Sequence, residues 1–116
     1  MSVIDHLLVD CREAVAEADG ECPWCGRVLP VGRRRWCSDS CRADFVDNHF
    51  WGHARDAALR RDRRACQRCG ARRSRLEVHH VEPRRGGGYA AGCHHHLDML
   101  ETLCRPCHVE VTNAHR

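Results

Sequence analysis

Eight of the ten cysteines in this chain of 116 residues stand in four closely spaced pairs. Two residues separate the cysteines in three of the pairs, and three residues separate them in the fourth. Such spacing lets both thiolates of a pair reach one tetrahedral zinc ion at about 2.3 Å. The pairs therefore predict two structural Zn(Cys)4 sites, one formed by Cys22, Cys25, Cys37 and Cys41 and the other by Cys66, Cys69, Cys104 and Cys107.

Zinc is favoured over disulfides because residues 1–20 lack the basic start and the uninterrupted apolar run of a secretory signal. Thiols stay reduced in the cytosol, so we expect a cytoplasmic protein. No segment has the apolar length of a transmembrane helix, and no membrane partner is expected. Metal is also needed for size reasons, because a chain this short cannot bury two self-sufficient apolar cores.

The first half of the chain predicts a helix, a zinc finger and a linking helix. Residues 2–19 have an apolar stripe, with Ser2 and Asp5 as a capping box and Cys11 as a buried thiol on the stripe. Residues 42–64 read as one long helix that Gly52 can bend. We therefore divide the chain into an N-terminal helix at 1–21, a zinc finger similar to a treble clef at 22–45, a linking helix at 46–64 and a second zinc module at 65–116.

Two histidines of the linking helix, His49 and His53, are four residues apart, which is the spacing of paired metal ligands on a helix. Because cysteines already complete both zinc sites, we interpret these histidines as packing or solvent-facing residues. In the second module, residues 76–79 alternate as a half-buried strand does, residues 84–92 are a glycine-rich loop, and residues 109–113 continue as a short helix.

Arginine is concentrated in the middle of the chain. Residues 53–85 hold eleven Arg and four acids, a local charge of +7. The guanidinium fork matches phosphate oxygens, so the cluster predicts a phosphate-binding face. The absence of Lys from the whole chain has a simpler explanation in genomic base composition, so it adds little. The candidate phosphate contacts are Arg84 and Arg85, with Arg60, Arg61, Arg63 and Arg64 as a second line.

The second module also contains a known arrangement of residues. Its sequence runs Leu76-Glu77-Val78-His79-His80-Val81-Glu82-Pro83, then Gly86-Gly87-Gly88, then Leu100-Glu101-Thr102-Leu103-Cys104-Arg105-Pro106-Cys107-His108. With the four cysteines, this order resembles the HNH endonucleases of the four-cysteine type. The resemblance implies a ββα-metal fold and metal-dependent hydrolysis of DNA to 5′-phosphate and 3′-hydroxyl ends, with RNA left open as a substrate.

The resemblance also implies roles for three histidines. His79 and His108 would bind a catalytic divalent cation, which could be Mg2+, Mn2+ or another transition metal, and His80 would be the general base. The residues themselves agree with this division, because neighbouring side chains on a strand face opposite ways. Zinc at the cysteines would hold the start of the helix that carries His108.

One position departs from the family. Met99 stands where the family usually has Asn, and methionine offers no hard oxygen ligand. We expect Asp98, as a further ligand of the catalytic metal, or a histidine of the run at residues 93–96 to replace the Asn in part. The run itself reads as an exposed polar tip over the site, and the alternative is a metal-reactive loop.

The fold expected from the sequence is a small zinc-stabilised α+β protein, with a ββα-metal core preceded by a zinc finger and a long linking helix. The expected function is that of a metal-dependent DNA endonuclease. The alternative is a non-catalytic zinc module with a degenerate HNH site that binds nucleic acid or protein. A purely structural adaptor, the third possibility, would have no salt-sensitive affinity for DNA.

Overall fold

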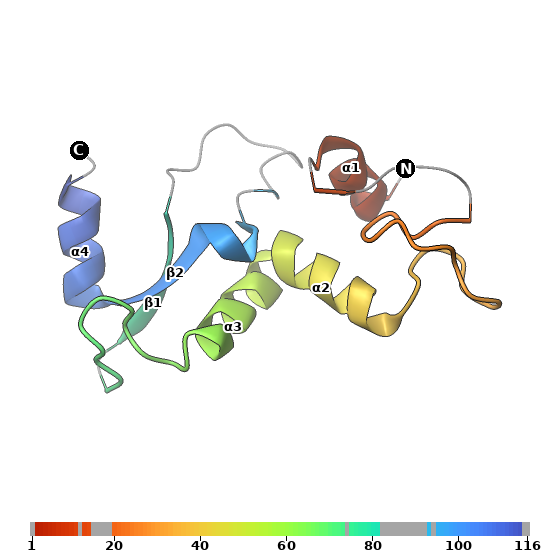
Figure 1. Cartoon of the computed structure of the whole chain (residues 1–116). Helices are drawn as coiled ribbons and strands as arrows, with labels where there is room; N and C mark the ends of the chain where they lie inside the picture. The colour runs from red at the N-terminus through yellow and green to blue at the C-terminus, as the bar shows by residue number, and fades with distance from the viewer. Residues whose placement is uncertain are drawn as a thin grey trace.

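The chain folds into a small α+β structure, shown by a computed structural model that describes residues 2–11, 13–14, 20–73, 75–81, 93 and 95–114. Figure 1 shows an elongated molecule, with α1 at one end, α2 and α3 in the middle, and two strands with α4 at the other end. Among the described helices, none combines the length and apolar character needed to cross a membrane. The elements are α1 (Val3–Asp10), α2 (Asp39–His49), α3 (Trp51–Arg61), β1 (Leu76–His80), the 3-10 helix η2 (Leu97–Met99), β2 (Leu100–Cys104) and α4 (Arg105–Ala114).

The N-terminal helix begins at the predicted capping box. The Ser2 hydroxyl accepts a hydrogen bond from the Asp5 backbone N–H, and the Asp5 carboxylate accepts one from the Ser2 backbone N–H. The predicted helix over residues 2–19 is too long, because α1 ends at Asp10 and Cys11 is extended, with φ −79° and ψ 123°. The chain leaves the helix there because the Cys11 side chain is buried against residues from other parts of the chain.

The linking segment is two helices, not the single helix predicted for residues 42–64. Ser38 caps α2 by accepting a hydrogen bond from the Cys41 backbone N–H, and the break falls at Phe50, which is extended with φ −111° and ψ 124°. Gly52, the expected bend, lies within α3. The break has a packing reason: Phe50 packs on the core of the N-terminal module, whereas α3 buries its alanines against the sheet.

The two strands form an antiparallel pair, with His79 opposite Glu101 and His80 opposite Leu100. Since side chains alternate along a strand, this register puts Val78 and His80 on one face and Glu77 and His79 on the other.

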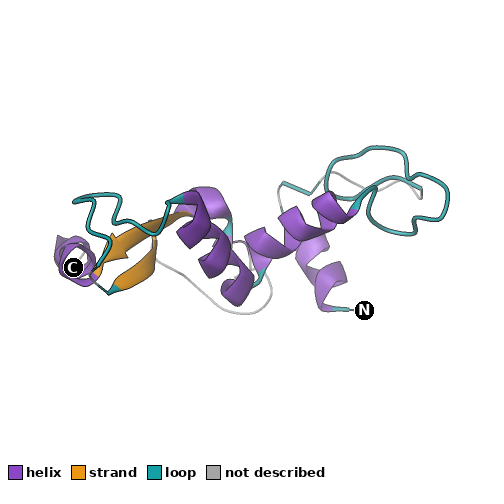
Figure 2. Cartoon of the chain, turned by 90° about the horizontal axis from the view of Figure 1, so that it is seen from below, coloured by secondary structure: helices purple, strands orange, loops and turns teal. Residues whose placement is uncertain are grey.

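Helices cover both faces of this small sheet (Figure 2). On the first face, Val78 and Leu100 pack with Ala54 and Ala58 of α3. Leu103 packs with Val111 of α4 on the second face. The observed order of strand, turn, strand and helix agrees with the prediction, although α4 starts at Arg105, earlier than the predicted residue 109.

Candidate functional site

Both predicted cysteine groups are assembled in the structure, and in each group the four Sγ atoms lie within 4.8 Å of one another. The separation between Sγ atoms is 3.4 Å for Cys25 and Cys37 and 3.6 Å for Cys69 and Cys104. A disulfide would require about 2.05 Å. Thiolates bound to one tetrahedral zinc ion at about 2.3 Å lie roughly 3.8 Å apart. The groups therefore have the spacing of metal sites.

The two knuckles have the same turn. The backbone N–H of Gly26 donates to the Cys22 carbonyl at 2.8 Å, and that of Gly70 donates to the Cys66 carbonyl at 2.8 Å. Both glycines are left-handed, with φ 77° and 78°, a conformation that costs other residues free energy. The glycine that follows the second cysteine is thus the residue the turn requires, as predicted for Gly26.

The thiols of one group are unequal. Burial raises the pKa of Cys66, but backbone N–H groups of Cys104, Cys69 and Arg68 outweigh it and lower this pKa to about 6. Hydrogen bonding with Cys104 and burial raise the pKa of Cys107 to about 12. Because close thiolates repel one another, a cation is needed to hold all four as thiolates, which is the form that binds metal.

On the face of the sheet covered by α4, two of the three predicted catalytic histidines meet. The rings of His79 and His108 are edge to face with centroids 4.9 Å apart. His108 Nδ1 lies 3.1 Å from a carboxylate oxygen of Glu77, and because a carboxylate only accepts, Nδ1 carries the proton. This hydrogen bond and the nearby Arg105 lower the pKa of Glu77. The Nε2 atom of His108 is left as the nitrogen that can bind a metal.

The His108 side chain borders a pocket of about 240 Å³. Arg105 stands at this pocket as a cation, with its Nη1 atom 3.4 Å from Glu77. The position therefore offers an imidazole, a carboxylate and a guanidinium beside an open volume. The lining residues are Glu77, Arg105, His108, Val109, Thr112 and Asn113.

His80 lies on the opposite face, as the alternation of side chains predicts. Its ring stacks on Trp51 with centroids 5.0 Å apart, and its Nε2 atom is 3.0 Å from Nδ1 of His95. His95 is buried and also packs on Trp51. Sequence reasoning did not assign Trp51 or His95 to this environment, because the contacts depend on how α3 and the segment before η2 pack against β1.

Other predicted site residues lie elsewhere. The Asp98 carboxylate groups with Glu13 and His96, and the described residues provide no set of three ligand atoms that includes His79 or His108. Met99 takes part through its backbone carbonyl, which accepts a hydrogen bond from Val81. The interpretation of residues 93–96 as an exposed tip was wrong for its described members, since His95 and His96 are 8% and 7% exposed. These histidines are buried because α2 and α3 pack against them.

The predicted arginines are in different situations. Arg60, Arg63 and Arg64 are exposed. Arg61 instead donates to the backbone carbonyls of Leu97 and Leu100 and forms an ion pair with Asp62 at 2.9 Å, which fastens the end of α3 to β2. Arg84 and Arg85, and the glycine-rich loop at 84–92, lie outside the described residues.

Four further residues come together that the sequence did not connect. Cys11, His49, Cys93 and His96 bring their ligand atoms within 4.8 Å of one another. Two signals were available: Cys11 and Cys93 are the cysteines left over from the four pairs, and two residues separate Cys93 from His96, which is knuckle spacing.

Comparison with known proteins identifies the second module. The family model described as HNH endonuclease matches residues 66–114. This segment contains the second cysteine group, β1, β2, η2 and α4. No curated protein and no solved structure matches the chain.

Proposed function

Starting from the HNH endonuclease segment at residues 66–114, we propose that the chain is a metal-dependent endonuclease that hydrolyses phosphodiester bonds of DNA. Two structural zinc ions, one in each four-cysteine group, stabilise a treble-clef-like finger and a ββα-metal unit. The observation that carries the proposal is the meeting of His79 and His108 beside Glu77, because it forms an oriented histidine pair next to an open pocket.

In the proposed mechanism, His79 and His108 hold the catalytic divalent cation, which neutralises negative charge that develops during phosphodiester hydrolysis. Glu77 holds the His108 ring with Nδ1 protonated, so that Nε2 faces the cation. Arg105 binds a phosphate oxygen at the same pocket.

His80 acts as the general base that accepts a proton from the attacking water. Trp51 and His95 hold the His80 ring in position on the other side of β1. Because His80 is the last residue of the strand, its ring can approach the substrate from the edge of the sheet. The exposed side chains of Arg60, Arg63 and Arg64 contact phosphates away from the scissile bond, and Arg84 and Arg85 do so next to the histidine pair.

A nicking assay on supercoiled plasmid tests this proposal. The wild-type chain is expected to nick with Mg2+ or Mn2+ and to leave ends that a DNA ligase reseals. His80→Ala should lose nicking by at least about 100-fold, since a general base contributes 10²–10⁴-fold. His53→Ala, which removes an exposed histidine of α3, is the matched control and should nick as the wild type does.

The alternative is a zinc module that binds DNA without cleaving it, and Met99 in place of the family's Asn favours it. This alternative gives salt-sensitive DNA binding with no nicking under any metal. If nicking is weak, Met99→Asn should raise it if the missing amide limits activity. Nicking that survives in His80→Ala would contradict the assigned base.

A further inference from the structure

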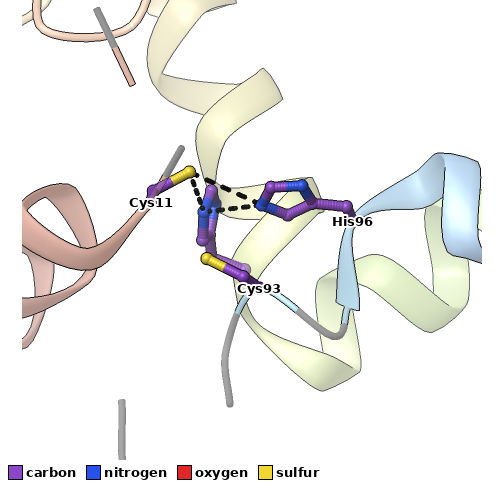
Figure 3. Close-up of side chains that lie close together, drawn as sticks. Cys11, Cys93 and His96 are labelled. Carbon is purple, nitrogen blue, oxygen red and sulfur yellow. Dashed lines mark hydrogen bonds between the residues drawn. The ribbon is translucent and has the colours of Figure 1, made fainter. Parts of the chain in front are cut away.

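A third group of possible metal ligands lies where three distant segments of the chain meet. Cys11 follows α1, His49 ends α2, and Cys93 and His96 precede η2. Figure 3 shows Cys11, Cys93 and His96 pointing toward a common centre. We propose that these four residues bind one zinc ion in a Cys2His2 site that joins the N-terminal segment to the segment beside His80.

The distances fit a tetrahedral ion. Cys11 Sγ is 3.4 Å from Nε2 of His49 and 3.6 Å from Nε2 of His96, and the two Nε2 atoms are 3.1 Å apart. With zinc bonds of about 2.3 Å to sulfur and 2.05 Å to nitrogen, tetrahedral geometry gives S–N and N–N separations of roughly 3.6 and 3.3 Å. The three ligand atoms therefore have the mutual spacing of ligands around one ion.

The outer nitrogens of both imidazoles are already engaged. Nδ1 of His49 lies 2.8 Å from the Phe45 carbonyl, and Nδ1 of His96 lies 3.3 Å from the Glu13 carboxylate. Both partners are acceptors, so each Nδ1 carries a proton and each Nε2 presents its lone pair to the centre. Two lone pairs 3.1 Å apart repel each other, and a cation between them removes the repulsion. Carboxylate and carbonyl partners on the outer nitrogen are typical of zinc-bound histidines.

Burial and charge also favour zinc. Cys11, His49 and His96 are 6%, 3% and 7% exposed. Desolvation lowers the pKa of His49 to about 4, so this ring is neutral at physiological pH, as a ligand must be. Two thiolates and two neutral imidazoles around Zn2+ give a net charge of zero, which lowers the cost of burial relative to an unpaired charge. The donor set is that of structural Cys2His2 zinc sites.

The ion would also act on the environment of His80. His95 stands between Cys93 and His96, and its Nδ1 atom is 3.0 Å from Nε2 of His80. Fixing the two ligands fixes the backbone on both sides of His95. This consequence rests on the proposed function of His80, whereas the zinc site itself does not.

Metal analysis of the purified full chain tests the site without any assay of activity. After desalting into metal-free buffer, we expect three zinc ions per chain. X-ray absorption at the zinc edge should show sulfur and nitrogen ligands together, because three sites of this kind supply ten sulfur and two nitrogen ligands. Two zinc ions with sulfur ligands alone would overturn the proposal, as would a Cys11–Cys93 disulfide found by thiol counting. The wild-type spectrum is informative even if a variant fails to fold.

Variants locate the third ion. Cys11→Ser/Cys93→Ser should lose one zinc ion and the nitrogen signal but keep the other two ions, whereas the His53→Ala control should keep all three. His108→Ala should also keep three. A third ion that disappears in His108→Ala but persists in Cys11→Ser/Cys93→Ser would belong to the nuclease site and would overturn the proposal. Nicking can fail in the wild type while the zinc results hold, so the two proposals are tested separately.

Discussion

Glu77 is the single residue that most directly sets the geometry of the proposed cation site. It lies two residues before His79 on the same face of β1, and its carboxylate reaches across to His108 on α4. A strand and a helix are thereby joined through the side chain of a proposed ligand. Removing such an outer hydrogen-bond partner typically weakens metal binding by 10–100-fold, even though the ligand itself is intact.

We therefore predict that Glu77→Ala raises the Mn2+ concentration required for half-maximal nicking by about 10–100-fold. Glu77→Gln should have a smaller effect, because its amide oxygen still accepts from His108. Titration of the nicking rate with Mn2+ measures both. Glu110→Ala, which removes an exposed carboxylate of α4, should leave the titration unchanged. An unchanged Mn2+ requirement in Glu77→Ala would show that Glu77 does not orient a ligand.

At the scale of elements, the end of α3 combines a structural clamp with strained backbone. Asp62 accepts hydrogen bonds from Arg61 and from the Thr102 backbone, so the helix end is fastened to the middle of β2. The next two residues, Arg63 and Arg64, are left-handed with φ 56° and 50°. This conformation costs a residue other than glycine roughly 1–2 kcal/mol. Strained residues of this kind tend to be kept for function, which favours a role in phosphate binding.

Arg63→Gly/Arg64→Gly is therefore expected to stabilise the fold and to weaken DNA binding. Denaturant unfolding should show a gain of up to about 1 kcal/mol per residue. The slope of log affinity against log salt should become shallower by about 2, one for each lost phosphate contact. Arg72→Gly/Arg73→Gly removes the same charge from exposed residues that are not left-handed, so it should give no gain in stability. An unchanged salt slope in the first variant would exclude these arginines from the interface.

The whole molecule is extended, and its core is divided. The radius of gyration is 16.4 Å, compared with about 13 Å for a compact domain of this length. The described apolar core falls into three small clusters, and two of them include cysteines of the four-cysteine groups. Each cluster is too small to stabilise its part of the chain by hydrophobic burial alone. Metal binding must supply much of the remaining folding free energy.

Removal of zinc by a strong chelator should accordingly unfold the chain. The far-UV circular dichroism signal of the helices is expected to fall, and tryptophan fluorescence should shift to longer wavelength as Trp36 leaves its buried position. Returning zinc should restore both signals, whereas removing only Mg2+ should change neither. A metal-free chain with the spectrum of the zinc-loaded protein would show that the apolar clusters are sufficient.

The sequence determined the features that depend on neighbouring residues. Both four-cysteine groups are built largely from pairs whose spacing is fixed by the covalent chain, and their glycine turns follow from the same spacing. The capping box at Ser2, the strand at residues 76–80 and the opposite directions of His79 and His80 also arise from local geometry. The HNH resemblance agrees with the family match because it rests on such short segments in a fixed order.

The tertiary structure decided the features that depend on distant residues. The break at Phe50 satisfies two separate cores, and no local pattern of residues 42–64 encodes that requirement. Cys11 and His96 are 85 positions apart in the chain, and His80 and His95 are 15 apart, yet both pairs are in contact. Such contacts arise from the packing of α2 and α3 against the other segments, which a periodicity or a spacing cannot express. The sequence therefore predicted the proposed zinc and nuclease ligands, and the fold added the surroundings that orient them.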